Sequence, residues 1–324
     1  MTSASAAHDG RSYYGRPIIK EPVWKPEIPV YFFTGGLGGA SGALSLAARA
    51  TGNERLAHTS LFVAAAAEAV SPVLLVSDLG RPERFLNMLR LFKVTSPMSV
   101  GSWILAASSS ASGVAAVLEL LGILPRVKAA AETVSALLGP PLATYTAVLI
   151  ADTAVPVWHE GRRELPFVFG GSAAASAGAA AICLVPPEDA GPARRLLLLG
   201  ALAEGTAMEV MKKRLGFLAE PYAQGESGRY GRLARSLTAA GTLVAGIGGR
   251  RGRTAAVAGG ALVLAGEMSL RWSIFKAGFQ SARDPKYTVE PQRRRLEEGG
   301  GRKGEADRDA AQARSEATPL GVRS

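Results

Sequence analysis

Residues 78–103 read DLGRPERFLNMLRLFKVTSPMSVGSW and form the one dense polar and basic stretch between two long apolar runs. Arginines and a lysine alternate here with leucine, methionine and phenylalanine, at a spacing that predicts an amphipathic helix in the membrane interface. Pro82 fits the first turn of this helix, Asp78 can cap it, and Pro97 with Ser99 ends it before the next apolar run. An ordinary interfacial loop with anchoring cations explains the same spacing equally well.

The apolar runs on both sides predict an all-α, polytopic membrane protein. Runs of sufficient length to span a bilayer lie at about 29–49, 57–77, 100–121, 137–157, 166–185, 194–212, 234–249 and 254–274. The first run carries a small-residue face, formed by Gly35, Gly38, Gly39 and Gly42, that permits close approach of another helix. We therefore expect eight transmembrane helices.

The two ends of the chain differ from this apolar region. Residues 1–28 are rich in proline and aromatic residues and lack the apolar centre of a signal peptide, so they predict an ordered N-terminal arm. Residues 284–324 are charged and poor in aromatic residues, which predicts a disordered tail. The single cysteine, Cys183, excludes an internal disulfide and any zinc or iron–sulfur site ligated by cysteines.

The basic balance of the chain, +10 at pH 7, is explained by membrane topology rather than by nucleic-acid binding. Sixteen Lys and Arg residues fall in the predicted connections on the side that holds the 78–99 segment, and nine fall on the other side. An even number of helices places both termini on one side. We therefore expect a multi-pass protein of the cell inner or plasma membrane, with both termini and the 78–99 segment in the cytoplasm.

Three stretches also give the chain a resemblance to a known family. They are residues 78–103, YYGRPIIKEPVWKPEIPVYFFTGGLGGASG (13–42) and YTAVLIADTAVPVWHEGRRELPFVFGGSAAASAG (145–178). Together they resemble the NrfD/PsrC family of polysulfide-reductase-type membrane subunits, over about residues 11–280. The resemblance implies a haem-free, quinone-reactive subunit with two four-helix bundles, at 29–157 and 166–274. It also implies docking to an iron–sulfur (ferredoxin-like) subunit of a molybdopterin oxidoreductase.

The histidines argue independently against a haem in this chain. His58 opens the second apolar run and His159 closes the fourth, on opposite sides of the bilayer, so they cannot form an axial pair. Electrons must then reach the quinone directly from a cluster on another protein. We expect the chain to bind quinone (menaquinone or ubiquinone) and to hold no haem and no metal.

Quinone reduction consumes two protons, so the pocket needs polar groups that bind the carbonyls and relay protons. Candidates gather at the cytoplasmic end of the first bundle: Tyr31, Thr34, Asp78, Arg81, Ser99, Trp103, Tyr145, Asp152 and His159. The resemblance assigns Tyr145 to a quinone carbonyl, while Tyr31 and Thr34 stand where family members use Asn or His. Asp78 would supply protons or order Arg81. Glu68 and Glu204 lie at mid-depth and predict proton paths.

Each candidate also has a structural interpretation. Asp78 and Arg81 can simply pair and cap the interfacial helix, Tyr145 can be a core tyrosine, and His159 can be an interface anchor. Glu267 and Arg271, four residues apart, can form an intrahelical pair without further function. For the whole chain, the alternatives are a structural membrane anchor for a peripheral redox complex and an ion-coupled secondary transporter. The two halves show no matching pair of Gly/Pro-interrupted helices that a transporter would have.

Overall fold

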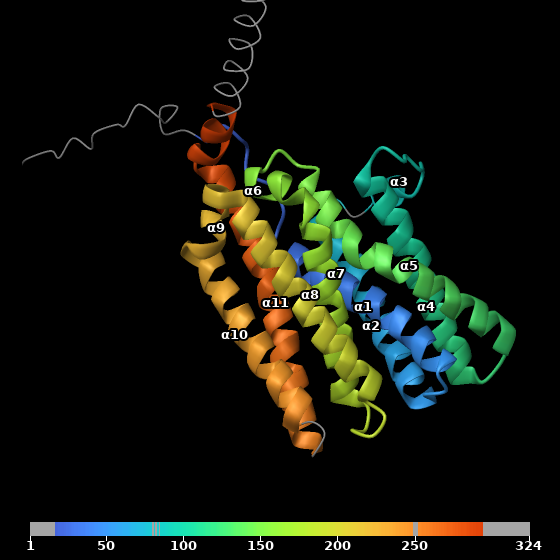
Figure 1. The fold of residues 1–324 in the computed structure, drawn as a ribbon. Coiled ribbons are helices and arrows are strands. Elements are labelled where there is room, and N and C mark those ends of the chain that lie inside the picture. Colours follow the sequence, from blue (N-terminus) through green and yellow to red (C-terminus); the bar gives the residue numbers. More distant parts are fainter. Residues whose placement is uncertain (1–16, 80, 82, 84, 249–251, 294–324) are drawn as a thin grey trace, which may run out of the picture. The chain divides into compact units, whose positions relative to one another are not determined.

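The computed structural model describes residues 17–79, 81, 83, 85–248 and 252–293 (Figure 1). Within these residues the chain is all-α, as predicted. Residues 21–280 form one compact unit, and residues 1–20 with 281–324 are grouped in a second. In the second unit, residues 286–293 are helical, so the predicted disordered tail does not begin at 284. The rest of that tail and residues 1–16 of the arm lie outside the described residues.

Eight helices of the described part are twenty residues or longer. They are α1 (Glu27–Ala50), α2 (Glu54–Asp78), α4 (Pro97–Leu121), α5 (Pro125–Ala151), α7 (Leu165–Leu184), α8 (Gly191–Leu215), α10 (Gly225–Ile247) and α11 (Arg253–Arg283). The connections contain the short helices α3 (Phe85–Met88), α6 (Pro156–Glu160) and α9 (Glu220–Ala223). By length and composition, α2, α4, α5 and α7 qualify as candidate membrane spans.

Prolines move the ends of the fourth predicted span. The sequence predicts a helix over 137–157, whereas α5 begins at Pro125 and ends at Ala151. Proline is favoured at the first helical position, where its missing N–H costs nothing. At the other end, Pro156 starts α6 and disfavours helix in the residue before it, so the chain breaks between α5 and α6.

The helices of the second half also extend beyond their predicted bounds. α10 begins at Gly225 rather than 234, so Arg229, Arg232 and Arg235 belong to a helix and not to a connecting loop. α11 continues to Arg283, beyond the predicted end at 274. Basic residues within the first turns of α10 lower the local hydropathy, so a prediction based on hydropathy places the start of the helix too late.

The 78–99 segment does not form the predicted amphipathic helix, because α3 is the only α-helix among the described residues between the end of α2 and the start of α4. The Ser99 hydroxyl donates a hydrogen bond to the Leu91 carbonyl (2.9 Å) and accepts one from the Lys93 N–H (3.0 Å). A side chain that binds these backbone groups competes with helical hydrogen bonding. Pro97, expected to end this segment, is the first residue of α4, and Ser96 is its N-cap. Pro82 and Arg84 lie outside the described residues.

The first four long helices pack around one another, α1 against α2 and α5, and α4 against α5 and α2. The predicted small-residue face of α1 is confirmed by its contacts. A Cβ atom at Gly39 would overlap the backbone of Gly139 on α5, and one at Gly38 would lie 2.5 Å from Cγ of Glu68 on α2. Small residues thus allow the backbones of α1, α2 and α5 to approach closely.

A second set of helices lies beside the first (Figure 1). α7 packs on α8, and α8 contacts α10. Gly241 of α10 meets Gly259 of α11, and Gly260 of α11 meets the Ala179 carbonyl of α7. α7 also contacts α1, α2 and α5, so it joins the two sets.

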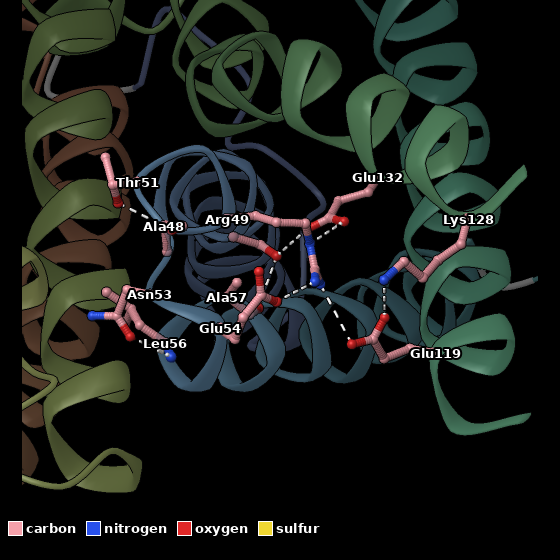
Figure 2. Close-up of polar contacts among 11 residues, drawn as sticks. Ala48, Arg49, Thr51, Asn53, Glu54, Leu56, Ala57, Glu119, Lys128 and Glu132 are labelled. Atoms are coloured by element: carbon pink, nitrogen blue, oxygen red, sulfur yellow. Dashed lines mark hydrogen bonds and ion pairs between the residues drawn. The ribbon is translucent and has the colours of Figure 1, made fainter. Parts of the chain in front are cut away.

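A charged cluster ties the four helices of the first set at one end (Figure 2). Arg49 of α1 donates from Nε to Glu132 of α5 (2.8 Å) and from Nη1 to Glu54 of α2 (2.7 Å). Its Nη2 lies 3.5 Å from Glu119 of α4, which also pairs with Lys128. Only 1% of the Glu132 side chain is exposed, so a buried carboxylate depends on this arginine. We call these five residues the Arg49 cluster.

Candidate functional site

A small cavity of about 70 Å³ lies at the end of the first helix set that is opposite the Arg49 cluster. Residues from six segments form its wall: Trp24, Ile28, Tyr31, Phe32, Leu75, Asp78, Leu79, Met88, Met98, Ser102, Tyr145 and Leu149. Three of the predicted site residues, Tyr31, Asp78 and Tyr145, are therefore brought together by α1, α2 and α5. Sequence analysis missed the apolar wall and Ser102, whose contribution depends on how the helices meet.

Tyr31 presents an unsatisfied donor at this cavity. The residue is 1% exposed, and its hydroxyl is buried without a hydrogen-bond partner in the part of the chain that the structure describes. Leaving a buried hydroxyl unpaired costs about 1–3 kcal/mol. The residue is therefore suited to a ligand that brings a hydrogen-bond acceptor, such as a carbonyl oxygen, into the cavity.

Tyr145 reaches the cavity because α4 has a glycine opposite it. A Cβ atom at Gly101 would overlap the edge of the Tyr145 ring. The neighbouring Ser102 hydroxyl donates to the Met98 carbonyl (2.8 Å), and both residues contribute to the wall. In the sequence, this contact is indicated only by the two small residues, Gly101 and Ser102, within VGSW. They are compatible with any helix, and the sequence does not show that Tyr145 packs against them.

Asp78 connects the cavity to the N-terminal arm. Its Oδ1 accepts a hydrogen bond from the Lys25 N–H (2.8 Å), and the adjacent Trp24 stacks on Trp158 with ring centroids 5.6 Å apart. Trp158 is fully buried, and its indole N–H donates to the Ile274 carbonyl (2.8 Å), so it is no interface anchor. Trp24 and Lys25, just before α1, are thus held by contacts with α2 and α6, and Trp24 forms part of the cavity wall.

Besides Thr34, which is described below, five predicted quinone-site residues lie outside the cavity wall: Arg81, Ser99, Trp103, Asp152 and His159. Trp103 packs edge-on against Phe92 and is 40% exposed. His159 is exposed beyond the end of α5, with Nδ1 3.2 Å from the Ala151 carbonyl. Ser99 orders the loop before α4, as described above. The assignment of these five residues to a quinone site stays a prediction.

Buried polar groups continue inward from Tyr31. The Thr34 hydroxyl lies 2.8 Å from that of Ser71, on α1 and α2 respectively. Deeper on α2, Glu68 is fully buried and accepts hydrogen bonds from Ser108 (3.0 Å) and Ser112 (2.7 Å) of α4. With about 1.5 Å rise per residue, Glu68 lies roughly 15 Å from Asp78 along the helix. Glu68 and Thr34 thus belong behind the cavity, and sequence analysis missed the two serines that hold Glu68.

Glu204 belongs to a separate group in the second helix set. Its carboxyl group lies beside the carboxyl group of Glu267 and interacts electrostatically with Arg271, and both of these residues are on α11. Thr238 donates to Glu267 (3.0 Å), while the Arg271 guanidinium lies 3.9 Å from the centre of the Phe169 ring. Glu267 and Arg271 are therefore parts of an interhelical cluster, and the intrahelical pair alone does not describe them.

One protein-family model matches most of the chain. A model of the NrfD-type polysulfide reductase family matches residues 11–283, which include the cavity and every long helix. The chain belongs to the NrfD polysulfide reductase family. No curated protein sequence matches the chain.

NrfD-family proteins are membrane subunits of redox complexes, and the apolar helices of this chain agree with that assignment. The resemblance drawn from residues 13–42, 78–103 and 145–178 is thereby confirmed. Within the described part of this NrfD-family chain, no group of three or more His, Cys, Asp or Glu residues is placed to hold a metal ion. The absence of metal and haem from the protein stays a prediction.

Proposed function

We propose that this chain is the quinone-reactive subunit of an oxidoreductase complex, which exchanges electrons between a docked iron–sulfur subunit and membrane quinone. One observation carries the proposal: Tyr31, Asp78 and Tyr145 line one cavity, and the Tyr31 hydroxyl there lacks a partner. A quinone offers two carbonyl oxygens as acceptors and an apolar ring that suits the remaining wall.

Different residues of the cavity bind the quinone and transfer its protons. Bound quinone supplies the two-electron, two-proton chemistry. Tyr31 and Tyr145 donate hydrogen bonds to its carbonyls, and Asp78, at the end of α2, accepts and passes on protons. The cavity is far smaller than the roughly 300–1,000 Å³ of typical ligand pockets. Met88 and Met98 belong to its wall, and their flexible side chains are suited to making room for the ring.

Protons reach or leave the site through buried polar side chains. The hydroxyl pair of Thr34 and Ser71 lies between Tyr31 and Glu68 along the helices. We assign Glu68 to proton relay, with Ser108 and Ser112 orienting its carboxyl. Glu204 and its cluster form a second, separate candidate path in the other half of the protein.

We further propose that all eight long helices cross the membrane, as two four-helix bundles with both termini in the cytoplasm. Four of them are apolar enough by themselves, and α1, α8, α10 and α11 are 23 residues or longer. α1, α8 and α11 pack against α7, and α10 packs against α8 and α11. A helix of about twenty residues spans the hydrocarbon core. Reporter fusions after Lys93 and after Leu124 should give cytoplasmic and external signals respectively.

The loop before α4 provides a surface for the partner. Leu91, Phe92 and Val94 expose 71%, 56% and 75% of their surface beside the cations Arg90 and Lys93. Exposed apolar side chains next to cations suit a protein interface. We assign this loop to the iron–sulfur subunit, which a molybdopterin subunit would in turn accompany. The small cavity keeps a purely structural anchor as the second candidate function.

The test uses the complex as it exists in its membrane. The chain is tagged and purified with its partner subunits, the quinone content is extracted and measured, and turnover is assayed with menaquinone and ubiquinone analogues. An artificial acceptor that takes electrons from the iron–sulfur subunit is the control. We expect bound quinone and quinone-dependent turnover. A complex that is active with the artificial acceptor but neither contains nor reacts with quinone would establish the anchor instead.

A further inference from the structure

A large groove separates α8 from α10 in the second helix set. Its volume is about 980 Å³, and Leu270 and Ser273 of α11, both buried, contribute to its lining. The sides carry mainly alanine, glycine and leucine, including Leu198, Leu202 and Leu243. The groove is distinct from the cavity at Tyr145, since the two share no wall residue.

One end of the groove is basic. Lys212 of α8 and Arg232 and Arg235 of α10 line it, together with the carboxylate of Glu209, while the second carboxylate of the lining, Glu204, lies five residues further along α8. Glu209 pairs with Lys212 at 3.4 Å and with Arg235 at 3.5 Å, while Arg232 donates to the Ala223 carbonyl. Three cations therefore face one carboxylate, and the excess positive charge is complementary to an anionic group.

The groove is also lined by buried polar atoms that have no hydrogen-bond partner among the described residues. They are the Tyr222 hydroxyl, the Thr242 hydroxyl and Oε2 of Glu204. Tyr222 is 5% exposed and Glu204 is 9% exposed, so neither group is satisfied by open solvent. Thr242 lies about two helical turns from Arg235, roughly 10 Å along α10. The two unpaired hydroxyls, of Tyr222 and Thr242, are donors and indicate a ligand with acceptor oxygens beside its charged end.

We propose that the groove between α8 and α10 binds an anionic phospholipid. The phosphate lies at Lys212, Arg232 and Arg235, the glycerol and ester oxygens accept hydrogen bonds from Tyr222 and Thr242, and an acyl chain follows the leucine-lined sides. Basic pockets between membrane helices bind the head groups of anionic lipids by the same chemistry. This proposal does not depend on the quinone site.

Two variants test the two ends of the ligand. Arg232→Gln with Arg235→Gln removes two of the protein cations that face the lipid head group. Gly205→Leu places an isobutyl group in the groove, and a Cβ atom at Gly205 meets nothing within 4 Å, so the new side chain starts in open space. The matched control, Arg55→Gln with Arg126→Gln, removes two exposed arginines away from the groove, one of them ion-paired with Asp189.

Lipid binding is measured by native mass spectrometry of the detergent-purified chain with added phosphatidylglycerol or phosphatidylcholine, and with inorganic phosphate as competitor. We expect tight binding of phosphatidylglycerol alone. The double arginine variant should bind it about thirtyfold more weakly, since each cation near an anionic lipid contributes about a factor of five. Gly205→Leu should also lose binding, and the control should retain it. Equal binding of both lipids, displacement by free phosphate, or equal loss in the control would overturn the proposal.

Discussion

The ring of Tyr145 on α5 lies directly against Gly101 on α4, so that any side chain at position 101 would occupy the space of the ring. The position of the Tyr145 hydroxyl at the cavity therefore depends on a residue that touches no ligand. If that hydroxyl binds quinone, the size of residue 101 controls turnover.

Gly101→Ala should displace the Tyr145 ring and lower quinone-dependent turnover about ten- to hundredfold, as expected when a binding group is misplaced by about 1 Å. Gly113→Ala is the matched control, because Gly113 lies on the same helix and a Cβ atom there meets nothing within 4 Å. Turnover with quinone, measured against turnover with the artificial acceptor, distinguishes the two. Unchanged quinone turnover in Gly101→Ala would show that the position of Tyr145 is unimportant.

Glu68→Gln should slow quinone turnover without removing quinone. Glu68 lies behind the cavity, held by Ser108 and Ser112, so its loss removes a proton carrier and leaves the cavity wall intact. Loss of a general acid or base typically costs about 10²–10⁴-fold in rate. Turnover and extracted quinone are measured together, with the exposed Glu188→Gln as control. A wild-type rate would leave Glu68 with a purely structural role.

Arg49→Gln should destabilise the first bundle by about 3–5 kcal/mol, because it leaves the buried Glu132 carboxylate without its arginine (Figure 2). Changing both residues to Met should recover most of this loss, since the uncompensated charge is then gone. Unfolding in a denaturing detergent measures the free energies. Arg55→Gln, which removes an exposed pair with Asp189, should cost less than about 1 kcal/mol. A similar cost for Arg49→Gln would contradict the importance of the cluster.

Arg214→Gln should lower the unfolding temperature by a few degrees at neutral pH and by less at acidic pH. Hydrogen bonds from Arg214 lower the pKa of Glu164, which lies just before α7, with Nε and Nη2 at 2.5 and 2.6 Å from its oxygens. Because the folded pKa is depressed, the contribution is present above the unfolded value of about 4.3 and is lost as the pH falls through the folded pKa. Thermal unfolding of both proteins between pH 7 and pH 3 checks this; a difference that grows on acidification would contradict it.

Hydropathy locates the helices, and successive membrane helices run in opposite directions. Together these two facts predicted which site residues lie near the same end of neighbouring helices. Tyr31, Asp78 and Tyr145 all lie near the same end of neighbouring helices, and the structure places them on one cavity. The small-residue face of α1 also follows from sequence, because only close packing explains Gly38 and Gly39 within an apolar run.

Contacts between segments that are distant in the chain could not be predicted from the sequence. Trp24 stacks on Trp158, and no local pattern relates them. Pro125 begins α5 with a polar stretch whose Glu132 is buried only because Arg49 of another helix neutralises it. Hydropathy treats such a residue as exposed, so the predicted span began too late. The prediction of a helix before Ser99 was wrong for a similar reason, since the Ser99 hydroxyl binds the backbone of Leu91 and Lys93 in place of the expected helical hydrogen bonds.

Photolabelling of the purified complex with an azidoquinone, followed by peptide mapping, tests most directly whether the cavity binds quinone. We expect label within residues 24–32, 75–88, 98–102 or 145–149, competition by unlabelled quinone, and a several-fold loss of label in Tyr31→Phe with Tyr145→Phe. Label confined to other helices, or label in the cavity that neither competition nor the double variant reduces, would contradict the central claim.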